Sequence, residues 1–179
     1  MSTFSARIIN WQRQHGRHCL PWQGADAYCV WLSEIMLQQT QVATVIPYYQ
    51  CFVSRFPDVA ALAAASEDDV LAHWSGLGYY SRARNLHVAA QLIMQRHEGK
   101  FPHHFDDILA LPGIGRSTAA AISALVFHER RAILDGNVKR LLARCFGIAG
   151  TSLSIPKGRN PIASHDTPIG RVIAPRSRT

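Results

Sequence analysis

No apolar run in the sequence approaches the ~20 residues that a membrane-spanning helix needs, so we expect no membrane insertion. The first seven residues, Met1-Ser2-Thr3-Phe4-Ser5-Ala6-Arg7, lack a basic stretch followed by an apolar one, and they predict no secretory signal. Cysteine is scarce, and no C-x-x-C spacing links Cys19, Cys29, Cys51 and Cys145. This spacing argues against a disulfide framework or a zinc site and indicates free thiols in a reducing, cytoplasmic compartment.

Charge is also sparse, and the patterns of β-strands are missing. Only 17% of the 179 residues are charged, whereas 47% are hydrophobic, which is typical of a globular chain. This length suits one domain, or one domain and part of another, and such a chain buries roughly 70% of its unfolded surface. Alternating apolar and polar residues do not occur, and no repeat of fixed period is found, which argues against sheet-based and repeat architectures.

The positive charge is unevenly distributed. The net charge is +7, and the last 29 residues contribute +4 of it, from five basic residues against Asp166 alone. Residues 151–179 also hold four of the nine prolines and no aromatic residue, so we expect a disordered Pro/Arg-rich tail. We therefore place a helical domain over residues 1–150 and a boundary near Gly150.

Apolar residues at helical spacing run through most of residues 1–150 and predict an all-α fold. A first helix begins near Phe4 and ends at Gly16, and another begins at a Ser66 cap that acidic residues follow. A helix over 30–46 is expected to end at Pro47. The remaining predicted helices cover 86–94, 105–110, 118–127 and 137–146.

One short segment, Leu111-Pro112-Gly113-Ile114-Gly115-Arg116-Ser117-Thr118-Ala119, predicts a tight turn between two helices. Its glycines allow a positive φ and a close backbone approach. The amides of the turn and of the next helix's first residues would point outward, toward an anion such as a DNA phosphate. The alternative is a plain helix–helix connection, where glycine is common.

This segment resembles the helix-hairpin-helix of base-excision DNA glycosylases of the endonuclease III superfamily, with the motif at about 105–127. Two further segments resemble one branch, the adenine-specific mismatch glycosylases (MutY-like): Trp31-Leu32-Ser33-Glu34-Ile35-Met36-Leu37-Gln38-Gln39-Thr40-Gln41-Val42 and Gly76-Leu77-Gly78-Tyr79-Tyr80-Ser81-Arg82-Ala83-Arg84-Asn85-Leu86. The resemblance runs from about Phe4 to about Ile148. It implies a six-helix-barrel-type lobe with an incomplete second lobe, and a monofunctional enzyme that removes adenine mispaired with guanine or 8-oxoguanine.

The resemblance implies two catalytic carboxylates. Glu34 matches the family's general acid, which protonates the departing adenine, and a buried position would favour its protonated form. Asp135 matches the carboxylate that stabilises the positive charge developing on the sugar. The alternatives are a helix-surface glutamate for Glu34 and a helix N-cap for Asp135, with Asn137 as a competing cap.

The same resemblance implies a set of DNA contacts. Gln39 and Tyr79 match residues that enter the base stack, because the enzyme must flip adenine out of the duplex. Arg82 and Lys139 are expected at phosphates, although Lys139 also lies four residues after Asp135, at the spacing of an intrahelical ion pair. The full set expected to bind DNA is Gln38, Gln39, Thr40, Gly78, Tyr79, Arg82, Leu111, Gly113, Gly115, Ser117, Asn137 and Lys139.

Two departures from the family qualify this hypothesis. Members that also cut the backbone carry a lysine nucleophile in the hairpin, where this chain has Ser117, so a bifunctional lyase is disfavoured. The family's 4Fe-4S cluster ligands are absent, so we expect neither cofactor nor metal, and a truncated or frameshifted product. The expected partner is double-stranded DNA with an A·G or A·8-oxoguanine mismatch, bound by a monomer and, in a bacterium, at the nucleoid. The alternative is a catalytically inactive DNA-binding remnant.

Overall fold

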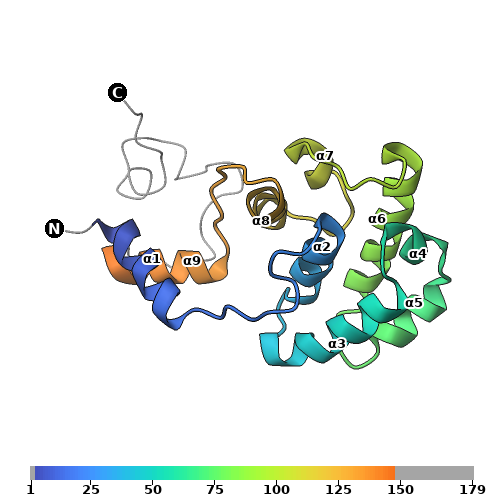
Figure 1. Ribbon diagram of the computed structural model, residues 1–179, viewed down its shortest axis with the longest axis horizontal. Helices are drawn as coiled ribbons and strands as arrows, with labels where there is room; N and C mark the ends of the chain where they lie inside the picture. Colours follow the sequence, from blue (N-terminus) through green and yellow to red (C-terminus); the bar gives the residue numbers. More distant parts are fainter. Residues whose placement is uncertain (1–2, 148–179) are drawn as a thin grey trace. The chain divides into compact units, whose positions relative to one another are not determined.

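The computed structural model describes residues 3–147, and the predicted tail over 151–179 lies outside them (Figure 1). The described residues form nine helices and no strand, so the all-α prediction is confirmed. They divide into two compact units. One unit is His18–Arg131, and the described part of the other consists of 3–17 and 132–147.

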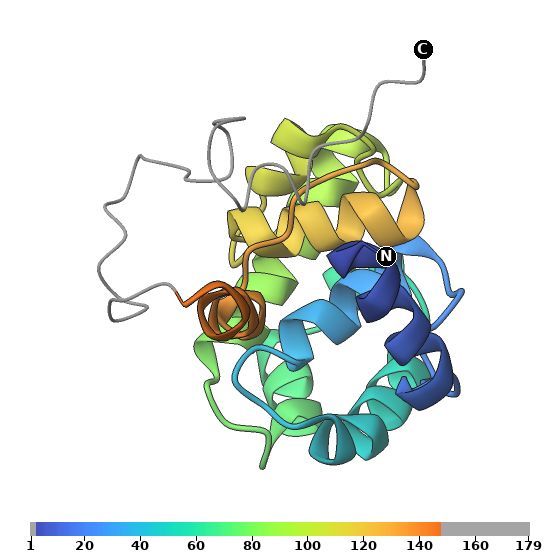
Figure 2. The same cartoon turned by 90° about the vertical axis from the view of Figure 1, so that its left-hand side faces the viewer.

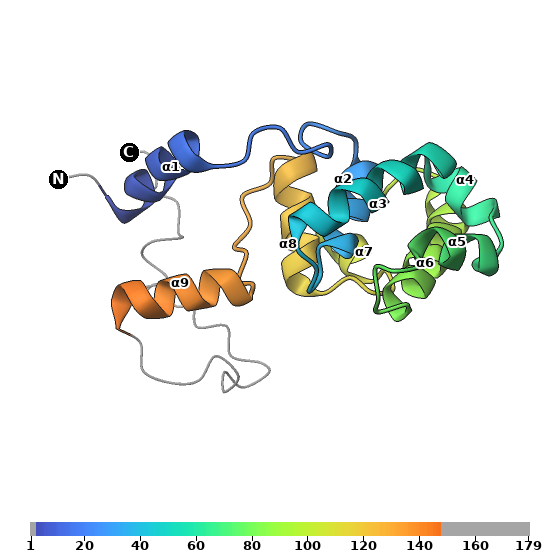
Figure 3. The same cartoon turned by 90° about the horizontal axis from the view of Figure 1, so that it is seen from below.

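The unit His18–Arg131 holds seven helices. They are α2 (Ala27–Met36), α3 (Val42–Arg55), α4 (Val59–Ala64), α5 (Glu67–Trp74), α6 (Ser81–His97), α7 (Phe105–Leu109) and α8 (Arg116–Val126). Helix α2 packs against α8, while α4, α5 and α6 gather at the other end of the unit, as Figures 1 and 3 both show. Figure 2 shows the same helices from the side.

Side-chain caps explain where several helices begin. The Asp26 carboxylate accepts a hydrogen bond from the Cys29 amide at 2.8 Å, and the Asp58 carboxylate accepts one from Ala61 at 2.7 Å. The predicted Ser66 cap is confirmed, since its hydroxyl accepts from the Asp69 amide at 3.2 Å. Each cap satisfies an amide that the first helical turn leaves unpaired.

The prediction of one helix over 30–46 is wrong. Helix α2 ends at Met36, the chain turns through Gln39 with a φ of 59°, and α3 begins at Val42. Pro47 lies inside α3 and does not end it. The turn contains neither glycine nor proline, and a distant side chain, Arg82, donates to the Met36 carbonyl and adds a hydrogen bond to the Ile35 carbonyl, which also accepts from the Gln38 amide.

The core of His18–Arg131 is built mainly from large side chains that are fully buried. Helix α2 is apolar on most of its circumference, as expected of a helix that other elements surround. The Phe52 ring packs at a tilt against Phe56 and edge-to-face against Trp74, with ring centroids 4.8 Å and 5.8 Å apart. The fully buried set includes Trp31, Leu32, Met36, Val45, Phe52, Phe56, Leu62, Trp74, Leu86, Ile93, Ile108 and Ile122.

The second unit contains α1 (Phe4–His15) and α9 (Gly136–Phe146). The first helix begins at Phe4 and has Gly16 as its C-cap, as predicted. The rings of Phe4 and Phe146 pack together, with their centroids 5.2 Å apart, while Ile9 and Trp11 are exposed. None of the described helices is long and apolar enough to cross a membrane.

Candidate functional site

Glu34 lies on α2, near the end of the most buried helix of its unit. Glu34 is half-buried, whereas its chain neighbours Ser33 and Ile35 are buried. It is the one charged residue of α2. The Ser33 hydroxyl donates to the Val30 carbonyl at 2.7 Å and is therefore satisfied within the helix. Helix α2 thus presents a single carboxyl group with partial access to solvent, which suits proton transfer.

Arg82, at the start of α6, lies inside the unit and is only 7% exposed. Its Nη1 donates to the carbonyls of Ile35, Met36 and Gln38, at 3.1, 2.7 and 2.6 Å. Burial lowers the pKa of the Arg82 guanidinium, and the neighbouring Tyr79 partly opposes this shift. The predicted phosphate contact of Arg82 does not fit this geometry, because the guanidinium is occupied by protein oxygens and withdrawn from the surface.

The other terminal nitrogen of Arg82 reaches a second loop. Its Nη2 donates to the carbonyls of Leu77 and Gly78 at 3.3 and 3.2 Å, and to the Thr40 hydroxyl at 3.2 Å. One side chain thus joins the turn after α2 to the loop before α6. Four residues of the predicted DNA-binding set meet there: Gln38, Thr40, Gly78 and Arg82.

Gln39 and Tyr79 project from these two loops. Both are exposed and both adopt left-handed backbone conformations, with φ of 59° and 49°. Tyr79 is 58% exposed, and its ring centroid lies 5.3 Å from the Arg82 guanidinium carbon. Non-glycine residues rarely adopt a positive φ, and those that do are concentrated at functional sites.

The helix-hairpin-helix segment comprises α7, a turn, and α8. Leu111 and Ile114 are buried and anchor the turn, so the Leu111 side chain faces the core; only its backbone remains for a ligand. Gly115 caps α8 without a side-chain hydrogen bond, which leaves the first amides of an 11-residue helix without intrahelical acceptors. Ser117 is half-buried on the first turn of this helix. The geometry suits the binding of an anion.

The hairpin is also tied to the turn after α2. The Gln38 side-chain amide donates to the Gly113 carbonyl at 3.3 Å, across 75 residues of sequence. Gly113 has a φ of +78°, and a Cβ placed on it would lie 2.9 Å from Cβ of Asn85. Both features favour glycine at this position.

We expect Gly113→Ala to weaken both the fold and duplex binding. A left-handed alanine costs about 1–2 kcal/mol, and Asn85 must shift in addition. Gly24→Ala is the matched control, because Gly24 also has a positive φ, of +70°, but has no neighbour within 4 Å of an added Cβ. In fluorescence anisotropy, Gly113→Ala should weaken binding to a duplex by roughly threefold to tenfold, whereas Gly24→Ala should not. Equal affinities for the two variants would contradict this role of the turn.

Asp135 lies in the second unit, as the N-cap of α9. Its carboxylate accepts a hydrogen bond from the Val138 amide at 2.7 Å, so the N-cap considered as the alternative role of Asp135 is present. Asn137 lies inside the helix, where its side-chain oxygen accepts a hydrogen bond from Arg140. Lys139 is half-buried on the same helix. Asp135 and Glu34 belong to different units, and their proximity stays a prediction.

The cysteines of the described residues are not grouped as ligands of a cluster or a metal ion. Cys19, Cys51 and Cys145 are exposed, Cys29 is half-buried, and all are free thiols. Within residues 3–147, no three His, Cys, Asp or Glu side chains come together as metal ligands. The described residues therefore offer no ligand set for a 4Fe-4S cluster.

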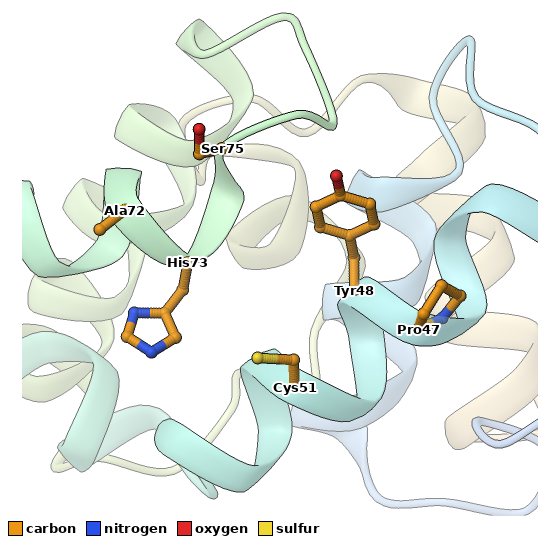
Figure 4. A pocket seen from close by; sticks show the side chains of 6 residues that line it. All are labelled: Pro47, Tyr48, Cys51, Ala72, His73 and Ser75. Carbon is orange, nitrogen blue, oxygen red and sulfur yellow. The ribbon is translucent and has the colours of Figure 1, made fainter.

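A shallow hollow of about 370 Å³ lies between α3 and α5 (Figure 4). Pro47, Tyr48 and Cys51 line one side, and Ala72, His73 and Ser75 line the other. None of them belongs to the predicted site. The hollow does border the Tyr79 loop, because a Cβ on Gly76 would meet the Tyr48 hydroxyl at 2.2 Å.

Two residues that support the Tyr79 loop were not predicted from the sequence. Trp74 donates from Nε1 to the Gly78 carbonyl at 3.1 Å, and Gly76 has a φ of +95°. The sequence does contain a signal for the turn, because two closely spaced glycines, as in Trp74-Ser75-Gly76-Leu77-Gly78, indicate a tight turn. The indole hydrogen bond has no comparable signal in the sequence.

Comparisons with known proteins show the family of the chain. Residues 32–156 match the model of the HhH-GPD superfamily base excision DNA repair protein. The chain is 51% identical over 148 residues to "Adenine DNA glycosylase" of Buchnera aphidicola subsp. Acyrthosiphon pisum, covering 82% of this chain and 42% of that relative. It is 40% identical over 154 residues to "Adenine DNA glycosylase" of Homo sapiens, covering 80% of this chain and 28% of the relative. The chain thus spans less than half the length of these curated relatives.

Solved structures show the same fold. A thermostable thymine-DNA glycosylase superposes with a TM-score of 0.77 at 25% identity, covering 87% of this chain and 71% of that one. The protein of a non-covalent endonuclease III–DNA complex superposes with a TM-score of 0.71 at 17% identity, covering 97% and 76%. This second likeness concerns the fold alone.

Proposed function

The chain belongs to the HhH-GPD superfamily of base excision DNA repair proteins, and from this premise we propose that it hydrolyses the N-glycosidic bond of adenine mispaired with guanine or 8-oxoguanine. One observation carries the proposal most directly. Within a single unit, the half-buried Glu34 stands at the end of α2, and the exposed Gln39 and Tyr79 project from two loops joined beside that end. The relatives named adenine DNA glycosylase, at 40% and 51% identity, support the choice of base.

In the proposed reaction, Glu34 acts as the general acid. It donates a proton to a ring nitrogen of adenine while the bond between base and sugar breaks, and the bonding electrons leave with the base. Asp135 offsets the positive charge that develops on the sugar. A water molecule then adds to the sugar carbon and gives up a proton to the Glu34 carboxylate, which restores the acid, so hydrolysis leaves free adenine and an abasic site.

DNA binding is proposed to use the hairpin and the two loops. The exposed backbone amides at the start of α8 bind a phosphate, and Asn137 and Lys139 of the second unit add further contacts. Gln39 and Tyr79 enter the base stack and hold the duplex open, because adenine is inaccessible while it is paired. We propose that a single copy of the chain binds the mismatched duplex.

A single-turnover assay tests the proposed reaction. With protein in excess over a duplex that contains one A·8-oxoguanine pair, we expect release of adenine, followed by strand cleavage at the abasic site after treatment with alkali. A duplex with T·A in place of the mismatch is the control and should remain intact. Binding of the mismatched duplex without adenine release would overturn the enzymatic proposal and favour a DNA-binding role without turnover.

Borohydride trapping provides a separate prediction. A lyase that attacks the sugar with an amine forms a Schiff base, which borohydride reduces to a stable protein–DNA adduct. Because Ser117 occupies the hairpin position where a lysine nucleophile would stand, we expect adenine release without a trapped adduct. A major adduct on denaturing gels would contradict the monofunctional assignment, and Lys139→Met would show whether Lys139 forms it.

A further inference from the structure

Arg82 is a buried cation whose six hydrogen-bond acceptors are all uncharged. Five are main-chain carbonyls, and the sixth is the Thr40 hydroxyl. A buried charge is costly unless hydrogen bonds satisfy it, and a leucine or methionine would fill the same space at lower cost. The presence of a guanidinium inside the unit is therefore explained by the two loops that its hydrogen bonds connect.

The two terminal nitrogens of Arg82 differ in the loops that they reach. Nη1 reaches only the segment that follows Glu34, including the Gln38 carbonyl at 2.6 Å. Nη2 reaches Leu77 and Gly78 of the other loop, and also Thr40. The Gln38 and Gly78 carbonyls directly precede Gln39 and Tyr79, so Arg82 holds the peptide unit next to each exposed side chain.

Those two peptide units need such support. Gln39 and Tyr79 both adopt a positive φ, and a non-glycine residue in that region persists only where surrounding contacts over-determine it. Arg82 supplies these contacts to both residues, and its guanidinium also lies 5.3 Å from the Tyr79 ring, within the range of a cation–π interaction. The two strained conformations thus share one support.

We infer that Arg82 is a positioning residue that holds Gln39 and Tyr79 at a fixed distance from each other and from the helix end that carries Glu34. This inference deepens the proposed function and rests on it for its consequence in DNA. Because one guanidinium holds the peptide units that precede Gln39 and Tyr79, the two side chains enter the base stack together, and the extruded adenine is delivered to Glu34. If either side chain inserts alone, the duplex is bent but the base is not held near the acid.

Two substitutions separate this role from simple core support. Arg82→Lys keeps the positive charge, but its donors lie on one nitrogen, which cannot span the acceptors of a planar fork. Arg82→Met keeps an apolar stem of similar length without any donor. Arg96→Met is the matched control, because Arg96 is an exposed arginine in the last turn of the same helix.

Amide hydrogen exchange of the free protein is the decisive measurement. The Thr40 amide donates to the Leu37 carbonyl in one loop, and the Leu77 amide donates to the Trp74 carbonyl in the other. In Arg82→Lys we expect both amides to exchange at least about tenfold faster, while helices α4 and α5 keep their protection. Faster exchange in one loop only, or in neither, would overturn the inference. Faster exchange throughout His18–Arg131 would also overturn it, because Arg82 would then support the whole unit.

A DNA measurement then tests the consequence. With 2-aminopurine placed beside an A·8-oxoguanine pair, the wild-type protein should raise the fluorescence as the neighbouring bases unstack. Arg82→Lys should lose most of this rise and slow adenine release at least about tenfold, while duplex affinity changes by less than about threefold. Arg96→Met should match the wild type in all three readouts. A wild type that releases no adenine would refute the proposed function, whereas the exchange measurement still decides on Arg82.

Discussion

Glu34→Gln should reduce the single-turnover rate of adenine release by roughly 10²–10⁴-fold, the contribution that general acid catalysis usually makes. The substitution replaces a carboxyl group by an amide of nearly the same shape, so packing at the half-buried position is preserved while the transferable proton is lost. The rate should fall at saturating protein, and duplex affinity should change little, because the lost interaction belongs to the transition state.

The control for this prediction is Glu98→Gln. Glu98 is an exposed carboxylate at the C-terminal end of α6, so its substitution makes the same chemical change away from the candidate site. We expect its rate to equal that of the wild type. A Glu34→Gln rate within about threefold of the wild-type rate would show that Glu34 is not the acid.

Trp74→Ala should lower the free energy of unfolding of His18–Arg131 by about 3–5 kcal/mol, the usual cost of removing a buried large aromatic ring. Trp74 is fully buried, contacts the Phe52 ring, and lies 5.5 Å from the Arg82 guanidinium carbon. It also donates to the Gly78 carbonyl, so the substitution removes support from the loop that carries Tyr79. Urea unfolding followed by circular dichroism measures the loss.

Two further variants sharpen the Trp74 prediction. Trp74→Phe keeps a ring but loses the indole donor. In this variant the Leu77 amide should exchange faster, while the free energy of unfolding should fall less than in Trp74→Ala. Trp11→Ala removes an indole that is 61% exposed, and it should change stability by less than about 0.5 kcal/mol. Equal losses for Trp11→Ala and Trp74→Ala would contradict the assignment of Trp74 to the core.

Local sequence signals predicted much of the fold. The Ser66 cap with its acidic first turn and the Gly16 end of α1 were readable because capping depends on neighbouring residues only. The Pro112-Gly113 turn was readable for the same reason. Helix α4 was not predicted, since six residues rich in alanine show no clear apolar spacing.

Features that depend on tertiary contacts could not be predicted from the sequence. The chain breaks between α2 and α3 without glycine or proline, at a point where Arg82 from a distant helix donates to the Ile35 and Met36 carbonyls. Arg82 itself was expected at the surface, where most arginines lie, and only the folded structure shows it inside. Periodicity places Glu34 on a helix but cannot indicate whether Asp135, 101 residues away in the sequence, lies near it, so a relation between the two residues depends on family resemblance alone.

The left-handed conformations of Gln39 and Tyr79 limit which amino acids can occupy these two positions during evolution or in a mutant library. Valine, isoleucine and threonine are strongly disfavoured by their branched Cβ, whatever chemistry they would offer a base stack. Asparagine, aspartate and glycine fit the backbone at lower cost. The side chains available for the proposed contact with DNA are therefore limited first by backbone geometry and only then by their interactions with bases.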